Sequence, residues 1–212
     1  MARNFVVARP QEADASRMAE IHIAAMDANP LLHAQCPTPE SLRSLQRFLE
    51  AYYAEQLRDP SSGVLIARDP GTGVISGFAK WNSPSHPEKV KLESGSPTAV
   101  EGCQRKFLDR YVELAEKAKR RCFGDQPCYS ISFVCTDPAH QGKGVGTLLT
   151  QKVLELAMRD RLPVYLESTD VAIHMYRKLG FRAIDEIQME IPRPTSGETT
   201  ITYREVCMVW QP

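Results

Sequence analysis

Apolar residues recur at two spacings along the chain, and each spacing predicts a different kind of element. Apolar positions three and four residues apart predict helices, whereas short apolar runs bounded by turn residues predict strands. The predicted helices span residues 11–27, 40–57, 103–121, 142–160 and 171–179. The predicted strands span residues 5–8, 64–67, 74–79, 128–136, 163–167, 181–190 and 201–210. Pro30, Pro37 and Pro39 are interpreted as breaks between the first two helices.

The order of these elements predicts a single mixed sheet. The turn residues 69–73, Asp-Pro-Gly-Thr-Gly, favour an antiparallel hairpin between the two strands that they separate. The later strand–helix–strand unit, residues 128–167, requires a crossover between parallel strands. We therefore expect an α/β (α+β) fold in which helices flank a mixed sheet of roughly six to seven strands. No repeat or long linker divides the sequence, so residues 1–212 should form one domain.

Composition and charge argue against nucleic-acid-binding and membrane-spanning proteins. Hydrophobic residues make up 42% and charged residues 25% of the 212 positions, which is ordinary for a globular protein. The 26 basic and 26 acidic residues give zero net charge, which argues against a nucleic-acid partner. The one basic cluster, Lys117, Lys119, Arg120 and Arg121, is expected at a solvated helix end. No apolar run approaches the ~18 residues that span a membrane, and the first residues lack a signal-peptide pattern, so we expect a cytoplasmic protein.

The cysteines give no sign of a metal site. None of the six belongs to a CxxC pair, and the histidines have no spacing that suggests metal binding. In a reducing compartment all six should be free thiols. They are Cys36, Cys103, Cys122, Cys128, Cys135 and Cys207.

The most informative segment is a glycine-rich turn between a predicted strand and a predicted helix. Gly142, Gly144 and Gly146 follow the strand at once, where glycine allows unusual backbone conformations and close approach of a ligand. The unpaired amides and positive dipole end of the following helix suit a pyrophosphate. A plain tight turn is the alternative. The spacing fits neither the nucleotide P-loop nor the dinucleotide-binding GxGxxG pattern.

Two motifs resemble those of a known family. Gln141-x-x-Gly144-x-Gly146 matches the Q/R-x-x-G-x-G/A signature of the GNAT superfamily of acyl-CoA N-acyltransferases. Thr136-x-Pro138 stands where that family often has V-x-P. About 30 residues downstream, Ala172-x-x-x-Tyr176-x-x-x-Gly180-Phe181 matches the family pattern A-x-x-x-Y-x-x-x-G-F. The motifs cover about residues 130–185, and the GNAT-like order of elements covers nearly the whole chain.

The resemblance implies acetyl-CoA as co-substrate, with no metal. Strands 130–136 and 163–167 should diverge, and the pantetheine arm should bond the backbone of Val134, Cys135 and Thr136. The pyrophosphate should lie on the turn amides, namely those of Gln141, Gly142, Lys143, Gly144, Val145, Gly146 and Thr147. Lys143 itself is either a solvent-facing turn residue or a charge near a phosphate. The sequence departs from the family at Thr169, where an Asn is common, so the hydroxyl of Ser168 or Thr169 is expected to replace that contact.

The resemblance also implies roles in proton transfer. In the family, the tyrosine at the position of Tyr176 protonates the departing thiolate, and its alternative role here is packing. Glu167, at the end of a strand beside the expected divergence, is the candidate base, acting through water. A structural carboxylate is the alternative for Glu167. His140 is expected to be an exposed turn residue rather than a catalytic group.

The acceptor pocket of such enzymes forms around the first two helices and their loop, here residues 26–39. The aromatic and imidazole candidates, each with ordinary core packing as an alternative, are His22, His33, Tyr52, Tyr53 and Trp81. The predicted function is acetyl transfer to a primary amine, in particular of a small molecule. A protein amine as acceptor, a non-catalytic acyl-CoA-binding protein and a chromatin-bound regulator are the other hypotheses. Two loops, residues 83–101 and 192–199, are expected to shape access to the acceptor site.

Overall fold

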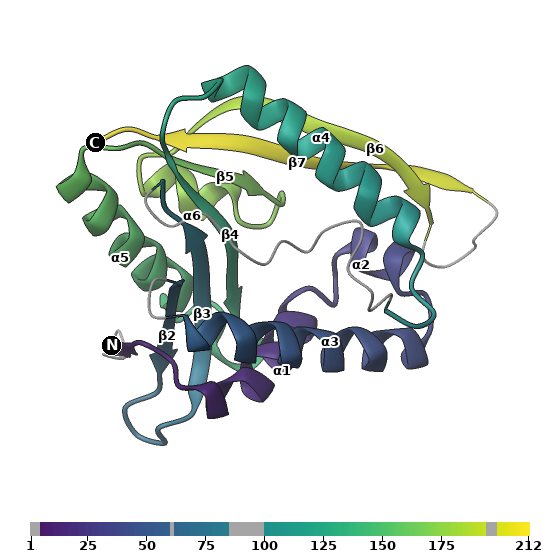
Figure 1. Ribbon diagram of the computed structural model, residues 1–212, viewed down its shortest axis with the longest axis horizontal. Helices are drawn as coiled ribbons and strands as arrows, with labels where there is room; N and C mark the ends of the chain where they lie inside the picture. Colours follow the sequence, from purple (N-terminus) through teal and green to yellow (C-terminus); the bar gives the residue numbers. More distant parts are fainter. Residues whose placement is uncertain (1–4, 60–61, 85–99, 194–198) are drawn as a thin grey trace.

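A computed structural model describes residues 5–59, 62–84, 100–193 and 199–212. In these ranges seven strands form one sheet in the order β1-β2-β3-β4-β5-β7-β6 (Figure 1). Only β4 and β5 are parallel, so the expectation of an α/β fold with a mixed sheet is confirmed. The strands are β1 (Val6–Ala8), β2 (Gly63–Arg68), β3 (Ile75–Asn82), β4 (Tyr129–Thr136), β5 (Val164–Ser168), β6 (Arg182–Pro192) and β7 (Thr200–Trp210).

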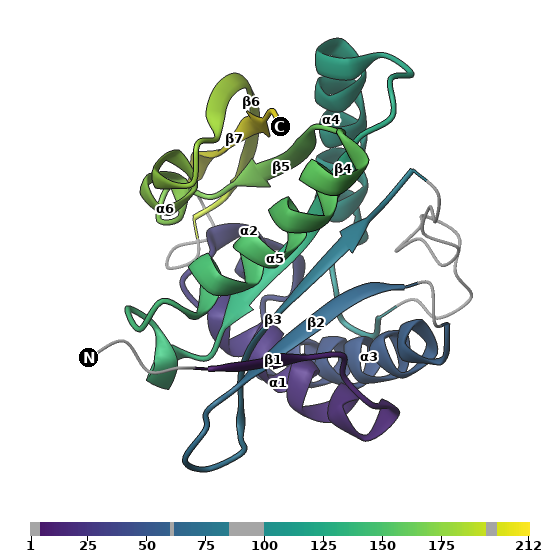
Figure 2. The same ribbon diagram turned by 90° about the vertical axis from the view of Figure 1, so that its left-hand side faces the viewer.

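The helices divide between the two faces of the sheet. One face packs against α1 to α4 and the other against α5 and α6 (Figure 2). The α-helices are α1 (Ala15–Ala25), α2 (Pro30–Gln35), α3 (Pro39–Arg58), α4 (Arg105–Phe123), α5 (Val145–Asp160) and α6 (Ile173–Lys178). Two short 3-10 helices, η1 (Glu12–Asp14) and η2 (Pro138–His140), precede α1 and follow β4.

Helix α2 shows where the sequence interpretation was wrong. Pro30 begins this helix instead of breaking the chain, because proline fits the first helical position, where no amide partner is needed. The Asn29 side chain caps the same end by accepting a hydrogen bond from the Leu31 amide at 2.9 Å. Pro39 likewise stands in the first turn of α3, behind the cap that Thr38 forms.

Helix α5 begins three residues later than predicted. Gly144 has a left-handed conformation with φ of 87° and caps the helix, whose first residue is Val145. The turn that precedes α5 is held against the sheet by close packing beneath it. A Cβ on Gly77 of β3 would lie 2.7 Å from the Cys135 carbonyl oxygen and 2.7 Å from the Val145 side chain. The absence of a side chain at Gly77 therefore sets how closely α5 approaches the sheet.

The expectation of six free thiols was wrong for one pair. Cys36, which ends α2, forms a disulfide with Cys103, 67 positions later and just before α4, with their Cα atoms 4.6 Å apart. The Gln104 amide also donates a hydrogen bond to the Gln35 carbonyl at 2.6 Å. The fold brings the two segments together over a separation that sequence spacing does not reveal. The free cysteines are Cys122, Cys128, Cys135 and Cys207.

Most of the two loops expected to shape access falls outside the described residues, in 85–99 and 194–198. Among the helices that are described, none combines the length and apolar character needed to cross a bilayer.

Candidate active site

The parallel strands β4 and β5 separate soon after they meet. They pair only over Tyr129–Ile131 and Val164–Leu166. On the other side of β4, Lys80 pairs with Phe133 and Trp81 with Ile131, which leaves Ser132 as the extra residue of a β-bulge. Beyond Ile131, the edge of β4 that faces β5 therefore keeps unpaired backbone groups, as the predicted divergence requires.

The predicted anion-binding turn is open. Gly142 and Gly144 both have positive φ, of 70° and 87°, and a Cβ on either would have no atom within 4 Å. The first amides of α5 have no partner inside the helix. The Lys143 ammonium donates to the Ala139 carbonyl at 2.6 Å, which favours its reading as a turn residue. Gln141 lies across the turn, with its amide nitrogen 3.4 Å from the Thr136 carbonyl.

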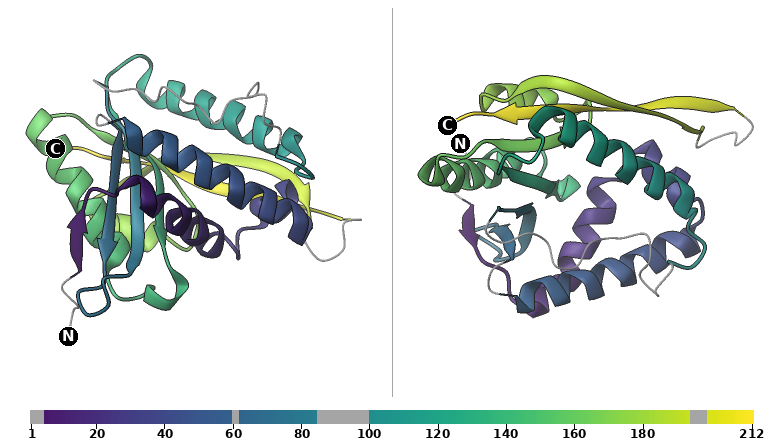
Figure 3. Two further views of the ribbon diagram at one scale, coloured as in Figure 1. Left: turned by 60° about the horizontal axis from the view of Figure 1, so that its bottom comes forward. Right: turned by 45° about the horizontal axis from the view of Figure 1, so that its top comes forward.

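A cavity of about 1070 Å³ lies mainly on the sheet face that α1 to α4 cover and reaches Ala172 and Tyr176 of the opposite face. Helices α3 and α4 flank it, and α2 lies between their ends (Figure 3). The predicted site residues that line the cavity are Val134, Cys135, Glu167, Thr169 and Tyr176. The predicted site residues outside its lining are Thr136 and the turn residues Gln141, Gly142, Lys143, Gly144, Val145, Gly146 and Thr147. The turn, which follows β4, thus lies outside the cavity.

The acceptor-site candidates separate into two groups. His22 and Tyr52 line the cavity, together with Met26 and Asn29 from the predicted loop. His33, Tyr53 and Trp81 do not line it. Of these, Trp81 lies in the core under α5, and His33 bonds the Asp27 carbonyl at 2.6 Å.

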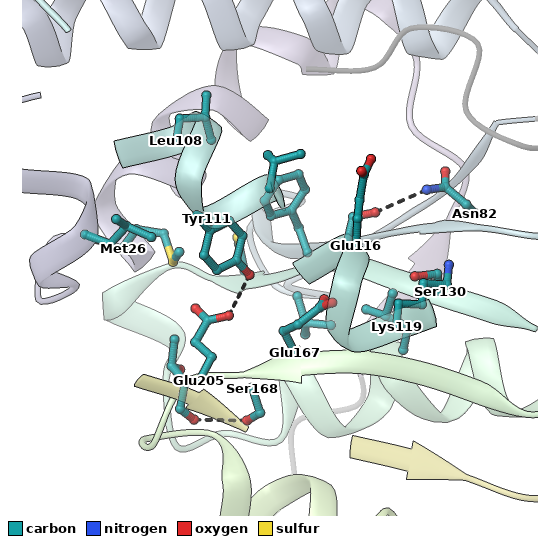
Figure 4. Close-up of a pocket in the computed structure, with 18 of the residues that line it drawn as sticks. Met26, Asn82, Leu108, Tyr111, Glu116, Lys119, Ser130, Glu167, Ser168 and Glu205 are labelled. Carbon is teal, nitrogen blue, oxygen red and sulfur yellow. Dashed lines mark hydrogen bonds between the residues drawn. The ribbon is translucent and has the colours of Figure 1, made fainter. Parts of the chain in front are cut away.

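Glu167 extends from β5 into the cavity (Figure 4). Burial, with a smaller contribution from the neighbouring Glu205, raises the pKa of its carboxyl to about 7. Tyr165 and Lys119 act in the opposite direction. A carboxyl with a pKa near neutrality is suited to accept a proton under physiological conditions. This pKa favours the hypothesis that Glu167 acts as a base over the hypothesis that it is a structural carboxylate.

The ring of Tyr176 is fixed by packing, whereas its hydroxyl makes no hydrogen bond to the described residues. Its side chain is 6% exposed, and its ring meets Phe181 edge-on with centroids 5.4 Å apart. Burial, more than the nearby Cys135, raises its pKa above the usual range, so the hydroxyl stays protonated at neutral pH. Among the described residues, this hydroxyl has no hydrogen-bond partner. It is therefore available to donate a proton into the cavity.

Three other ionisable groups are poorly suited to proton transfer in the cavity. Burial raises the pKa of Cys135 to about 12 and lowers that of His22 to about 4. His22 also bonds the Tyr53 hydroxyl at 2.6 Å and packs on Phe133 at 4.6 Å between ring centroids. His140 lies away from the cavity, 4.0 Å from Asp69 and 3.9 Å from Asp137. Glu167 is accordingly the best-placed base.

The sequence interpretation missed a buried carboxylate in the cavity, that of Glu205. Glu205 of β7 accepts hydrogen bonds from Tyr111 at 2.6 Å and from Tyr203. Strand β7 gives one signal of this: Tyr203, Glu205 and Cys207 alternate with other residues and share one face. An acidic residue between two inward-facing positions of an apolar strand is unusual. In the part of the chain that the structure describes, no group of three or more His, Cys, Asp or Glu residues is arranged to hold a metal.

The model of the acetyltransferase (GNAT) family matches residues 28–181. The chain belongs to this family. The match includes the diverging strands, the open turn and both motifs that suggested the relationship. An uncharacterized N-acetyltransferase of Schizosaccharomyces pombe is 37% identical over 73 residues, which are 32% of this chain and 31% of that relative. The match thus spans about a third of the curated relative.

Solved structures with the same fold cover nearly the whole chain. A structure described as histone acetyltransferase HPA2 and related acetyltransferase, from Corynebacterium glutamicum, has a TM-score of 0.62 at 20% identity, covering 98% of this chain and 96% of that one. A putative acetyltransferase of Salmonella typhimurium, solved with its cofactor acetyl-CoA, has a TM-score of 0.55 at 21% identity, covering 98% and 94%. At these identities the comparison confirms the GNAT fold.

Proposed function

We propose that the protein transfers the acetyl group of acetyl-CoA to a primary amine of a small molecule. One observation carries the proposal: Glu167, with its pKa near 7, and the protonated Tyr176 line one cavity beside the gap between β4 and β5. A base and an acid at the same opening are what acyl transfer to an amine requires. Family membership and the acetyl-CoA complex of the Salmonella typhimurium relative support this co-substrate.

The residues present fit acetyl-CoA. The unpaired edge of β4 beyond Ile131 offers backbone groups to a peptide-like pantetheine arm. The open turn at Gly142 and Gly144 offers helix N-terminal amides to a pyrophosphate. We assign the contacts of the arm to Val134, Cys135 and Thr136, and those of the pyrophosphate to the turn residues named above. Thr169, at the cavity wall, replaces the Asn common in the family.

Proton movements accompany the transfer. Glu167 accepts a proton from the acceptor ammonium, directly or through water, which leaves a neutral amine able to attack the thioester carbonyl carbon. As the carbon–sulfur bond breaks, the Tyr176 hydroxyl gives its proton to the departing sulfur. The second proton that the attacking nitrogen loses returns to the Tyr176 phenolate through water, and Glu167 releases its proton to solvent. The products are an acetamide and a CoA thiol. The buried thiol of Cys135, whose pKa of about 12 keeps it protonated, is a poor nucleophile, so we assign direct transfer to the amine.

The lining of the cavity supports a small acceptor. Glu167 shares this lining with Leu108, Tyr111 and Val112 of α4. An acceptor nitrogen at the carboxylate therefore lies among these side chains. A slender amine meets this requirement more readily than the surface of a folded protein.

A CoA-release assay tests the proposal. Acetyl-CoA is offered with polyamines, amino acids, amino sugars, arylalkylamines and histone peptides, and thermal unfolding is followed with and without CoA. We expect CoA to raise the melting temperature and at least one small amine to give acetyl transfer. Stabilisation by CoA without release against any amine would instead support a non-catalytic acyl-CoA-binding protein. Release only with peptides would make a protein amine the acceptor.

A further inference from the structure

The cavity is strongly acidic, although the chain as a whole has no net charge. His22 is neutral because burial lowers its pKa to about 4, so Lys119 is the one cation among the described residues of the lining. Two of the lining acids have partners on α4: Asp109 pairs with Arg105, and Glu113 with Arg110 and Lys117. The acidic residues of the lining are Asp109, Glu113, Glu116, Asp125, Glu167 and Glu205.

Glu205 is the most enclosed of these acids. It is 5% exposed, and its two oxygens accept hydrogen bonds from Tyr111 and Tyr203. Tyr203 is held in turn by Asn29, whose side-chain nitrogen lies 3.1 Å from the phenolic oxygen. Among the described residues, no cation forms an ion pair with Glu205. A buried carboxylate without a counter-cation is costly, and burial accordingly raises its pKa.

The cavity provides an apolar wall beside two carboxylates. Glu167 pairs with Cys207 in the register of β5 and β7, so Glu205 lies diagonally from Glu167 on the same face. Such diagonal neighbours are about 7–8 Å apart, a distance that a short aliphatic chain spans. Apolar side chains of the lining, from α2, α4 and the residue that follows α1, include Met26, Leu31, Leu32, Leu108 and Val112.

We propose that Glu205 binds a second positive charge on the acceptor, so that the substrate is an aliphatic amine with a further ammonium or guanidinium group. The nitrogen to be acetylated lies toward Glu167, the methylene chain packs on the apolar wall, and the distal cation pairs with Glu205. Tyr111 and Tyr203 are positioning residues that hold the carboxylate. This inference rests on the proposed function and names its substrate class.

Steady-state kinetics with two amines tests the inference. Butylamine and 1,4-diaminobutane share a chain and differ in the second amine. For the wild-type protein we expect kcat/KM to be at least about tenfold higher for the diamine, because charge-assisted hydrogen bonds to a buried carboxylate are strong. In Glu205→Gln the preference should fall to about twofold or less, mainly through a higher KM for the diamine.

Glu190→Gln is the matched control, because it removes the same charge from an exposed residue of β6 outside the cavity. It should keep the full preference, and an equal loss in both variants would overturn the assignment to Glu205. Equal kcat/KM for the two amines in the wild-type protein would overturn the inference, whatever the variants do. Release with no amine of any class would instead contradict the proposed function. Stabilisation by CoA confirms that each variant is folded.

Discussion

The two halves of the proposed site are built in different ways. The turn between η2 and α5 offers backbone amides, and its shape depends on positive φ at Gly142 and Gly144. The acceptor cavity offers side chains from helices and strands far apart in sequence, such as Tyr111 of α4 and Glu205 of β7. The turn is open, whereas the cavity holds a carboxyl with a pKa near 7.

This difference implies a division of labour. Backbone groups bind any ligand with a pyrophosphate, so the turn should contribute affinity for the co-substrate and little choice of acceptor. Side chains set proton transfer and charge complementarity, so the cavity should determine rate and specificity. Variants of the two halves should therefore separate CoA binding from catalysis.

The largest effect is expected for Glu167→Gln. Loss of the base should lower kcat/KM by about 10²–10⁴-fold, the usual contribution of positioned proton transfer. The stabilisation by CoA should stay as in the wild-type protein, because the turn is unchanged. Glu190→Gln is the control on an exposed strand position and should keep full activity. Unchanged kcat in Glu167→Gln would return Glu167 to a structural role.

Gly144→Asp should disrupt CoA binding at the turn. The new side chain places a negative charge at the proposed pyrophosphate site and a Cβ at a φ of 87°, so CoA affinity should fall on the order of 100-fold. Gly73→Asp is the control, since Gly73 also has positive φ, of 71°, and open space around it, but lies in the β2–β3 turn. Titration of the thermal shift with CoA measures both. Similar losses in the two variants would mean that backbone strain, and not the anion site, is responsible.

The pH dependence sharpens the assignment of Glu167. Its pKa of about 7 means that the base form is present above this pH, so at pH 6 kcat/KM should be about tenfold below its plateau. The folded chain also binds this proton more tightly than the unfolded chain does. Glu167 should therefore lower stability as pH rises from about 4.5 through 7, and Glu167→Gln should remove this decrease. A profile with no step between pH 6 and 8 would contradict the assignment.

Tyr176→Phe should slow acetyl transfer without weakening CoA binding. The ring and its contact with Phe181 are kept, so the protein should fold normally. Without the proton donor, kcat should fall by at least about tenfold. Tyr129→Phe removes a buried phenol that bonds Asp160 instead, and should leave kcat unchanged. If Tyr176→Phe lost CoA affinity at constant kcat, Tyr176 would be a binding residue.

The smallest effect on catalysis is expected from the disulfide that joins the end of α2 to the segment before α4. Thiol titration after denaturation without reductant should find the four free cysteines and not Cys36 or Cys103. Cys103→Ser should lower the free energy of unfolding by about 2–4 kcal/mol. Cys122→Ser, at a free and partly exposed cysteine, is the comparison and should cost less. Six reactive thiols in a freshly purified sample would show that the bridge does not form.

The glycine-rich turn was predictable because the residues that form it are close together in the sequence. Gln141, Gly144 and Gly146 follow one another closely, and the amphipathic pattern after them identifies the helix whose amides they expose. The boundary at Val145 was missed because the left-handed conformation of Gly144 delays the helix start. Helix α2 was missed because a proline at a first helical position resembles a proline that ends a helix.

The cavity half was only partly predictable. Glu167 and Tyr176 were proposed from family motifs and strand position, and both line the cavity. Glu205, Tyr203 and Tyr111 were not, because their association depends on the register between strands and on where α4 packs across β7. The disulfide was missed for the same reason, since α2 and the start of α4 meet only in the folded chain.

The conformation of the glycine-rich turn also depends on Gly77, which lies outside the motif. This residue lies more than sixty positions before Gly144, yet its missing side chain lets Val145, which is 1% exposed, rest on the strand below. Any larger residue at position 77 would lift the start of α5 and move its amides away from the divergence of β4 and β5. A relative can thus keep every residue of the glycine motif and still fail to bind the pyrophosphate of CoA. Surveys that separate active family members from inactive ones should read position 77 together with positions 141–146.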